Sequence, residues 1–193
     1  MRARPTGRPR TIDPDEVSLV ALRLFDDRGF DAVSMDDVAE AAGISRRSLF
    51  RLFPSKAALV WGGLDEFVDR FTTALAERPA DESADEALRA AYVVGATFPD
   101  RQVGVTRRRL RVIRRTPSLE LVGAATVAAL TDRITAFVAE RDGARVDDLD
   151  LDVAVRANAL AAAASAALTW WALHGGDEPP QDVVRRALSV PLP

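Results

Sequence analysis

The amino-acid sequence predicts an all-α protein in which a module of three short helices is joined by a long helix to a larger helical region. Apolar side chains recur at spacings of three and four residues in successive segments, as on the buried face of a helix. Proline and glycine separate these segments, and no stretch alternates apolar and polar residues as a half-buried strand would. The 193 residues, 48% of them hydrophobic, suffice for a small module and a larger domain.

The first predicted helix covers residues 13–28. Pro14 suits its first turn, and Gly29 suits the position just beyond its C-terminus. The apolar stripe of this helix follows the i, i+3, i+4, i+7, i+8 pattern and consists of Val17, Val20, Ala21, Leu24 and Phe25.

Two shorter helices follow. Ser34 precedes the first as a candidate N-cap, and Asp37 stands at the third helical position, which is a capping box with aspartate in place of glutamate. Gly43 ends that helix, because the residue past a C-terminus often needs a positive φ. Ser45 begins the next helix. Two short helices joined by a turn with glycine form a helix-turn-helix, which places its second helix in the major groove of DNA.

The second of these helices carries candidate side chains for base contact. Leu49 and Phe50 are expected to point inward, whereas Arg46, Arg47 and Arg51 project outward. A guanidinium group suits the O6 and N7 edge of guanine, so Arg46 and Arg47 are expected to read bases.

The rest of the chain is predicted to form longer helices. A helix capped by Ser55 is expected to run over residues 56–77 and to link the module to the larger region. Further helices are expected at about 84–97, 101–116, 118–141, 151–174 and 180–188. Residues 157–173 carry no charge, but the stretch is short for a membrane span and includes Asn158 and Ser165. We interpret it as a helix buried on most faces, as at an oligomer interface.

The composition argues against several classes of protein. Without cysteine there is no disulfide and no thiolate metal site, and a single histidine leaves little for a zinc site or a Ser–His pair. No carboxylate pair stands at a catalytic spacing, so we expect no enzyme activity, no metal and no cofactor. The N-terminus is polar and basic without an apolar h-region, which predicts a cytoplasmic protein with no membrane partner.

The net charge of −3 hides an uneven distribution, because the first twelve residues contain four arginines and no acid before Asp13. Two interpretations are open for this segment. It is either a disordered tail or an arm that orders on DNA, where it neutralises phosphates or enters the minor groove. Arg8 and Arg10 are therefore candidates for DNA contact.

Three motifs around the helix-turn-helix resemble those of the TetR family of bacterial transcriptional regulators. They are LF-x-x-x-GF before the unit, AGIS at the turn and LFRLFPSKAAL after it, and they cover roughly residues 10–60. The run ISRRSLFRLFPSK followed by VWG also resembles regulators associated with mycofactocin maturation systems. The resemblance implies a DNA-binding domain over residues 1–55 and a ligand-binding and dimerisation domain over residues 56–193.

The same resemblance implies roles for single residues. Ser34, Ser48 and Lys56 match positions that usually contact phosphates, and Phe50 stands where the family most often has tyrosine. The tyrosine hydroxyl and its phosphate contact are thus missing. The DNA-contact candidates are Ser34, Ser45, Arg46, Arg47, Ser48, Phe50, Arg51 and Lys56, together with Arg8 and Arg10.

The resemblance further implies a homodimer and a mechanism. In the family the last two long helices pair with their symmetry mates as a four-helix bundle, here about 151–174 and 180–188. Two recognition helices would then read the half-sites of a near-palindromic double-stranded DNA operator. A small apolar or amphipathic effector would release this repressor by shifting the linking helix. The alternatives are a helix-turn-helix activator, and an all-α ligand carrier or enzyme with an apolar pocket.

The run RRRLRVIRR, at residues 107–115, holds six arginines in nine residues, so an anionic group should lie nearby. One interpretation is that acids of the first helix or of the linking helix balance the charge. The other is that the arginines receive the phosphates of an acyl-coenzyme A whose tail enters the apolar interior. The ligand contacts would then be Tyr92, Phe98, Arg107, Arg111, Arg114, Phe137 and Trp170.

Overall fold

In the computed structural model, which describes residues 12–143 and 151–190, every regular element is a helix, and the predicted all-α class is confirmed. The elements are α1 (Pro14–Arg28), α2 (Met35–Ala41), α3 (Arg46–Leu52), α4 (Ala58–Trp61), α5 (Leu64–Ala76), α6 (Ala84–Gly95), α7 (Asp100–Arg115), α8 (Pro117–Arg141), α9 (Leu151–His174) and α10 (Pro180–Leu188).

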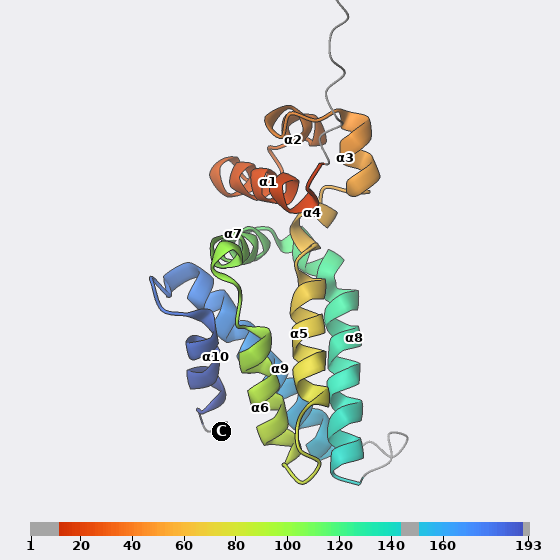
Figure 1. Cartoon of the computed structure of the whole chain (residues 1–193), viewed down its shortest axis with the longest axis vertical. Helices are drawn as coiled ribbons and strands as arrows, with labels where there is room; N and C mark the ends of the chain where they lie inside the picture. Colours follow the sequence, from red (N-terminus) through yellow and green to blue (C-terminus); the bar gives the residue numbers. More distant parts are fainter. Residues whose placement is uncertain (1–11, 144–150, 191–193) are drawn as a thin grey trace, which may run out of the picture.

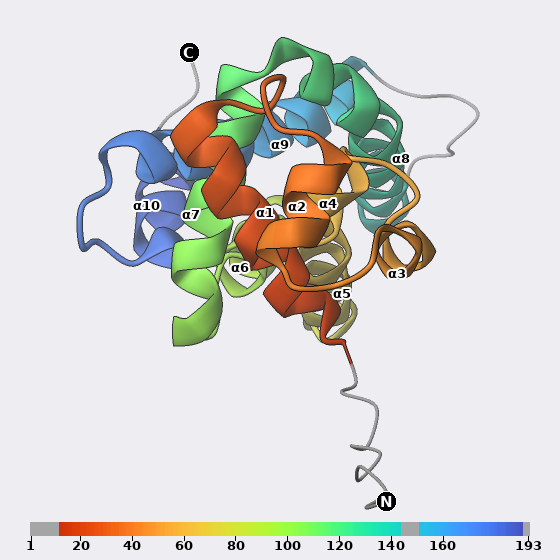
Figure 2. The same ribbon diagram turned by 90° about the horizontal axis from the view of Figure 1, so that it is seen from above.

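The helices form a small head and a longer body (Figure 1). α1, α2 and α3 make the head, and α5, α6, α8, α9 and α10 make the body. α7 lies at the top of the body and packs against α1, and Figure 2 shows the head overlying the body. Each part has its own buried hydrophobic cluster, but the head cluster also includes Val112 of α7 and Leu119 of α8. The head is therefore packed onto the body.

α1 has the predicted bounds to within one residue. Asp13 is its N-cap and accepts a hydrogen bond from the Asp15 backbone N–H at 2.9 Å, and Gly29 follows its end with a φ of 87°. Leu22, which the predicted stripe omits, is completely buried, whereas Val20 and Leu24 are only half-buried. The buried face is thus rotated by part of a turn from the one that apolar spacing predicts.

The linking helix predicted over residues 56–77 is in fact two helices, so this prediction is wrong. α4 is a single turn, and Gly62 and Gly63 separate it from α5. Glycine is a poor helix former, and two in succession favour a break. At Gly63 a β-carbon would also overlap the guanidinium of Arg109 on α7, so the break lets another helix approach closely.

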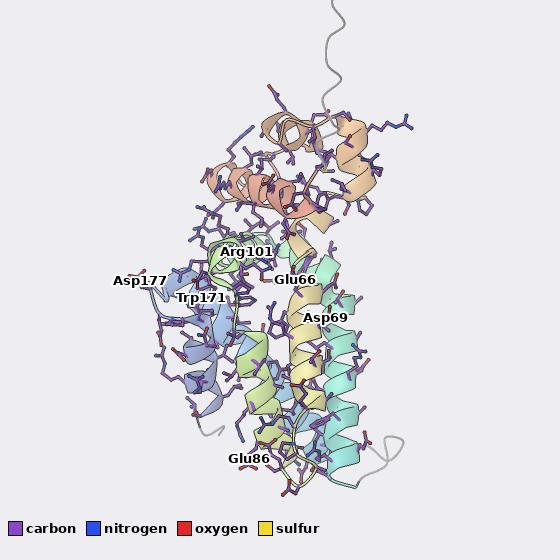
Figure 3. All side chains as sticks on the ribbon, in the orientation of Figure 1. Glu66, Asp69, Glu86, Arg101, Trp171 and Asp177 are labelled. Atoms are coloured by element: carbon purple, nitrogen blue, oxygen red, sulfur yellow. The ribbon has the colours of Figure 1, made fainter. Side chains whose placement is uncertain are left out.

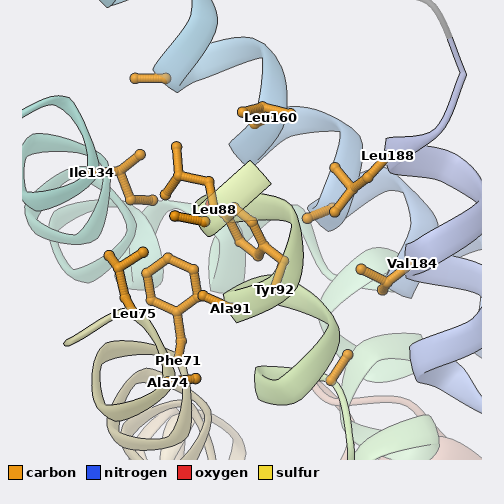
Figure 4. Packing of buried hydrophobic residues seen from close by; sticks show 14 of the residues in the cluster. Phe71, Ala74, Leu75, Leu88, Ala91, Tyr92, Ile134, Leu160, Val184 and Leu188 are labelled. Carbon is orange, nitrogen blue, oxygen red and sulfur yellow. The ribbon is translucent and has the colours of Figure 1, made fainter. Parts of the chain in front are cut away.

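Aromatic side chains build the core of the body (Figure 4). The ring of Phe71 on α5 lies 4.7 Å from that of Tyr92 on α6, and Ile134 of α8 joins the same cluster. Trp171 of α9 is completely buried, and its indole N–H donates to the carbonyl of Glu178 at 2.7 Å. These contacts join α5, α6 and α8 in one core and tie the segment after α9 back onto α9.

α10 contributes its apolar side to this same core. Its buried side chains are Val183, Val184 and Leu188, and it packs against α6 and α9. This corrects the expectation that residues 180–188 form half of an intermolecular bundle, because their apolar face is already covered by their own chain.

α8 and α9, in contrast, are apolar but largely uncovered. Leu121 and Val122 on α8 and Leu151 and Val155 on α9 are all more than half exposed, Leu121 by 79%. Both helices are long and apolar enough to cross a membrane, a weak signal that helices of soluble proteins also give. α8 and α9 also pack against each other.

Candidate nucleic-acid interface and effector cavity

Reciprocal hydrogen bonds between Ser34 and Asp37 fix the start of α2. Ser34 Oγ accepts from the Asp37 backbone N–H at 3.1 Å, and Asp37 Oδ2 accepts from the Ser34 backbone N–H at 2.7 Å, which confirms the predicted capping box. The Ser34 hydroxyl also donates to Asp37 Oδ2 at 2.6 Å. Hydrogen bonds from this hydroxyl and then from the backbone hold the pKa of Asp37 below its ordinary value.

A glycine turn and a second cap set the direction of α3. Gly43 has a φ of 65°, and the backbone N–H of Ile44 donates to the carbonyl of Ala39 at 3.0 Å. This is the Schellman ending that glycine permits. Ser45 then caps α3, because its Oγ accepts from the Ser48 backbone N–H at 3.1 Å. The predicted helix-turn-helix is thus present in full.

The inward face of α3 differs from the predicted one. Leu49 is completely buried, as expected, but Phe50 is 41% exposed, so the prediction that Phe50 points inward is wrong. Neighbouring residues of a helix point about 100° apart, and the inward face continues through Phe53 instead. The ring of Phe50 lies on the outside beneath the guanidinium of Arg46, at 5.4 Å.

Three exposed arginines occupy the outer surface of α3, as predicted. Arg46 is held by Asp36 of α2 at 2.9 Å. Arg47 and Arg51, which share one face of the helix, have no ion pair among the described residues. Their guanidinium groups are therefore available for a partner outside the chain, while that of Arg46 has a competing acceptor.

Lys56 takes a different role from the phosphate contact expected of it. Its ammonium donates to the carbonyls of Phe30 at 2.7 Å and Val33 at 2.9 Å, and lies 4.2 Å from the centre of the Phe30 ring. Two carbonyls and an aromatic face satisfy the charge inside the head. We therefore assign Lys56 to tying the segment between α1 and α2 to the segment after α3.

The remaining candidates for DNA contact are two serines and two arginines. The hydroxyls of Ser45 and Ser48 are hydrogen-bonded to each other at 2.9 Å near the start of α3. Arg8 and Arg10 lie outside the described residues.

A single buried carboxylate docks the head on α7. The side chain of Asp26 on α1 is only 8% exposed and accepts from Arg111, from Arg108 at 3.3 Å and from Arg115 at 3.3 Å. This confirms the interpretation in which acids of the first helix balance part of the arginine run. Arg111 is thereby committed to the head and is not available to a ligand in the body.

The other arginines of the run have separate surroundings. Arg114 lies 3.9 Å from Glu120, and both side chains are more than half exposed. The guanidinium of Arg107 lies 4.5 Å from the ring centre of Trp171. The run is therefore not a continuous anion-binding band.

A cavity of about 340 Å³ lies in the body among α5, α6, α7, α8 and α9. Most of its walls are apolar, with Trp61, Leu64, Phe67, Leu110, Ile113, Leu130, Ile134 and Leu168 among them. Of the predicted ligand contacts, Tyr92, Phe98 and Arg114 line the cavity. The other four do not, namely Arg107, Arg111, Phe137 and Trp170.

Two of these four, Phe137 and Trp170, make aromatic–cation contacts outside the cavity. Trp170 is 45% exposed on the outside of α9, with Arg186 over its ring, and Phe137 lies beneath Arg141. One of two adjacent tryptophans is therefore core and the other surface.

A second cavity, of about 270 Å³, lies between head and body at the break between α4 and α5. Figure 3 labels Glu66 and Arg101, two of its lining residues, at this junction. The two cavities share four lining residues, Gly63, Phe98, Thr106 and Arg109. They are therefore neighbours with Arg109 at their boundary.

Arg109 is the functional candidate that sequence reasoning missed. Because six of the nine residues in the run are arginines, the residue type does not distinguish Arg109 from the others. Its spacing from neighbouring inward-facing residues does. It lies three residues after Thr106 and four before Ile113, and all three line the larger cavity. Helical periodicity through the arginine run would have placed Arg109 on the inward face.

A helix-turn-helix head with exposed arginines on its second helix, set on a helical body with an apolar cavity, defines a DNA-binding transcriptional regulator. Residues 19–60 match the bacterial regulatory proteins of the tetR family, and residues 82–190 match the MftR C-terminal domain. The chain belongs to the TetR family, with a C-terminal domain of the MftR type.

Individual relatives agree with this assignment. The chain is 38% identical over 142 residues to a protein of Mycobacterium tuberculosis described as a mycofactocin biosynthesis transcriptional regulator, MftR, covering 74% of this chain and 72% of that one. It is 39% identical over 93 residues to the transcriptional regulator EthR of the same species, covering 46% and 43%. The resemblance to the mycofactocin-associated regulators seen in the sequence is thus confirmed.

Solved structures have the same fold. The fatty acid degradation regulator FadR from Bacillus halodurans has a TM-score of 0.63 at 14% identity, covering 91% of this chain and 96% of that one. The TetR family regulator PfmR from Thermus thermophilus has a TM-score of 0.58 at 22% identity, covering 89% and 94%. At these identities the likeness concerns the fold alone.

Proposed function

We propose that this protein is a ligand-released repressor that binds a near-palindromic DNA operator as a homodimer. The observation that carries the proposal is the exposed arginine surface of α3, on a head that is packed onto a body with an apolar cavity. In this proposal the protein acts in the cytoplasm and has no catalytic role. An activator would share the same DNA contacts, and a reporter gene behind the operator distinguishes the two.

The DNA contacts follow from the outer surface of α3. Arg47 and Arg51 reach the major groove directly, and Arg46 joins them by exchanging Asp36 for a guanine edge or a phosphate. The exposed ring of Phe50 offers an apolar contact to a thymine methyl group in place of the absent hydroxyl. Ser34, Ser45 and Ser48 reach phosphates only if their hydroxyls leave the capping bonds. Arg8 and Arg10 remain proposed as an arm.

The dimer in this proposal forms through α8 and α9. The uncovered apolar residues on these helices include Leu121, Val122, Val127, Leu151, Val155 and Leu173. Large exposed apolar surfaces on a soluble chain mark sites of association. Two copies of an α8–α9 face would make a four-helix bundle, which buries both faces and sets the separation of the two α3 helices.

The effector in this proposal enters the larger cavity and is amphipathic. Apolar walls receive its body, and the half-exposed Arg114 and Glu120 stand on the lining near solvent. Acyl-coenzyme A is one candidate, with its acyl chain inside and its phosphates toward Arg114. Arg107 and Arg111 cannot serve it without leaving Trp171 and Asp26.

The boundary between the two functional domains belongs at the glycine pair. The sequence predicts a division at residue 55, but Leu59 and Val60 of α4 are completely buried within the head cluster. We place the boundary at Gly62 and Gly63, where the helix breaks.

Operator binding tests the proposal. An operator is selected from random duplexes with the wild-type protein, and affinity is measured by fluorescence anisotropy. Replacing Arg46 and Arg47 together by Ala removes two contacts worth roughly 1–3 kcal/mol each, so affinity should fall about a hundredfold or more. A double variant of Arg185 and Arg186 on α10 loses the same charge elsewhere and should bind normally. Equal binding by both double variants would refute the assignment of α3.

A further inference from the structure

Arg109 lies at the boundary of both cavities without a carboxylate partner. Its Nε–H donates to the carbonyl of Val60 at 2.6 Å, and among the described residues this is its one hydrogen bond. Four of the five other arginines of the run have a carboxylate partner, three at Asp26 and one at Glu120, and the fifth, Arg107, lies over the ring of Trp171. The two terminal nitrogens of Arg109 therefore have donors that no described residue accepts, and the residue lines both cavities.

Such a guanidinium is costly inside a protein. Arg109 is half-buried, so its cation loses part of its hydration without gaining a carboxylate partner, and this desolvation lowers the pKa of Arg109 below the ordinary arginine value. Glu66 and Asp15 oppose this shift, but neither lies within ion-pair distance of Arg109. The cavity thus combines apolar walls with one uncompensated positive charge, which is complementary to an apolar anion.

We propose that Arg109 is the anion-binding residue of the effector cavity, and that the effector is an apolar monocarboxylic acid whose carboxylate hydrogen-bonds to its terminal nitrogens. The inference deepens the proposed function and rests on it for the regulatory part only. A planar guanidinium matches a carboxylate with two parallel hydrogen bonds. Among the charged lining residues Arg114 is balanced by Glu120, so the one positive charge of Arg109 and about 340 Å³ of largely apolar space suit one carboxylate and one hydrocarbon body.

The same residue connects the cavity to the head. Its hydrogen bond to Val60 joins α7 to α4, and its guanidinium fills the place of the missing side chain at Gly63. A carboxylate that draws the guanidinium toward the body competes with the Val60 carbonyl. Binding of the acid therefore loosens α4 at the break before α5, and the head loses one of its ties to α7.

The first experiment needs no DNA and no variant. Isothermal titration calorimetry compares decanoate, decanamide and decanol, which share a chain and differ in the head group. Tryptophan fluorescence follows the same titrations, since one of the three tryptophans, Trp61, lies in the cavity wall. A charge-assisted hydrogen bond favours decanoate by about tenfold or more over either neutral probe. Equal affinities, or no binding of any probe, overturn the proposal.

Two pairs of variants then locate the preference. Arg109→Gln should bind decanoate and decanamide equally, whereas Arg107→Gln, two residues away and outside the lining, should keep the wild-type preference. Gly63→Ala should reduce the preference because its β-carbon displaces the Arg109 guanidinium. Gly62→Ala, whose β-carbon meets only the Ala58 carbonyl at 3.3 Å, should not.

The outcomes separate this inference from its premise. Thermal melting establishes that each variant is folded, and if Arg109→Gln is not, Gly63→Ala decides. A decanoate preference that survives in both overturns the proposal. The proposal is also overturned if decanoyl-coenzyme A, which has no free carboxylate, binds much more tightly than decanoate and its affinity is the same in Arg109→Gln as in the wild type. In the wild type, decanoate should release operator DNA, and in Arg109→Gln it should not. If the wild type binds no DNA but keeps its decanoate preference, the repressor function fails and the carboxylate site stands.

Discussion

Replacing Asp26 by Asn should destabilise the protein by weakening the attachment of the head to α7. Asn keeps the size of the side chain and one oxygen acceptor, but it removes the negative charge on which three guanidinium groups converge. The Asp26 side chain is 8% exposed, while those of Arg111, Arg108 and Arg115 are 26%, 36% and 61% exposed. The carboxylate is thus nearly dry, and the arginines reach water to different degrees.

The magnitude follows from these exposures. Removing one partner of a fully buried ion pair costs about 3–5 kcal/mol. Arg115 recovers much of its hydration here and Arg108 part of it, whereas Arg111 does not, so we expect a loss of about 2–3 kcal/mol. For a chain of this length each kcal/mol lowers the melting temperature by roughly 2–4 °C, which gives a decrease of about 4–12 °C.

Thermal unfolding followed by far-ultraviolet circular dichroism measures this difference. Asp27→Asn is the matched control, because Asp27 is the next residue, is exposed and has no ion pair among the described residues. It should melt within about 1 °C of the wild type, as surface changes usually do. If Asp26→Asn had the same melting temperature as Asp27→Asn, the view that this carboxylate docks the head on α7 would be refuted.

Two further predictions concern the start of α2 and the dimer. Ser34→Ala should cost about 1 kcal/mol in urea unfolding, because it removes the N-cap acceptor. Because the folded pKa of Asp37 is depressed below 3.8, its ionised form stabilises the fold above that pH, and the contribution is lost as the pH falls through the folded value. Ser34→Ala should raise the pKa of Asp37 in NMR titrations, and an unchanged pKa would argue against the hydroxyl as its main cause. Leu121→Asp on α8 should give monomers in analytical ultracentrifugation. Val190→Asp also replaces an exposed apolar residue by aspartate, but it lies outside α8 and α9 and should leave dimers intact.

Local signals predicted most of the fold. Caps and breakers at Ser34, Gly43 and Ser45 act within a few residues of themselves, and the structure has the helix-turn-helix that they predict. Several helix ends of the body also coincide with such signals: α7 begins directly after Pro99, α8 at Pro117 and α10 at Pro180, and α9 ends directly before Gly175. Such signals depend on backbone geometry and not on the rest of the molecule.

The errors arose where distant segments decide the outcome. Phe50 faces out because Leu49 occupies the inward direction, and apolar type alone does not choose between adjacent residues. Lys56 points inward because two carbonyls of the α1–α2 segment lie within reach. The charge of the arginine run is divided by Asp26, eighty-two residues or more from its partners. None of these partners is adjacent in sequence. The spacing of the arginines could therefore indicate that an acidic partner is needed, but it could not indicate which arginine would have no acidic partner.

The docking of the head through Asp26 constrains how this regulator can be rebuilt by recombination. Grafting the head onto a different body at Gly62 and Gly63 would bury that carboxylate against whatever side chains the new α7 carries. A chimaera lacking arginines there would hold an unpaired negative charge between its halves. A head that carries Asp26 can therefore be exchanged only onto a body whose α7 has matching arginines. A head that is neutral at position 26 does not need them. In this chain, the head and the arginine surface of α7 that holds Asp26 would therefore have to be exchanged as one unit.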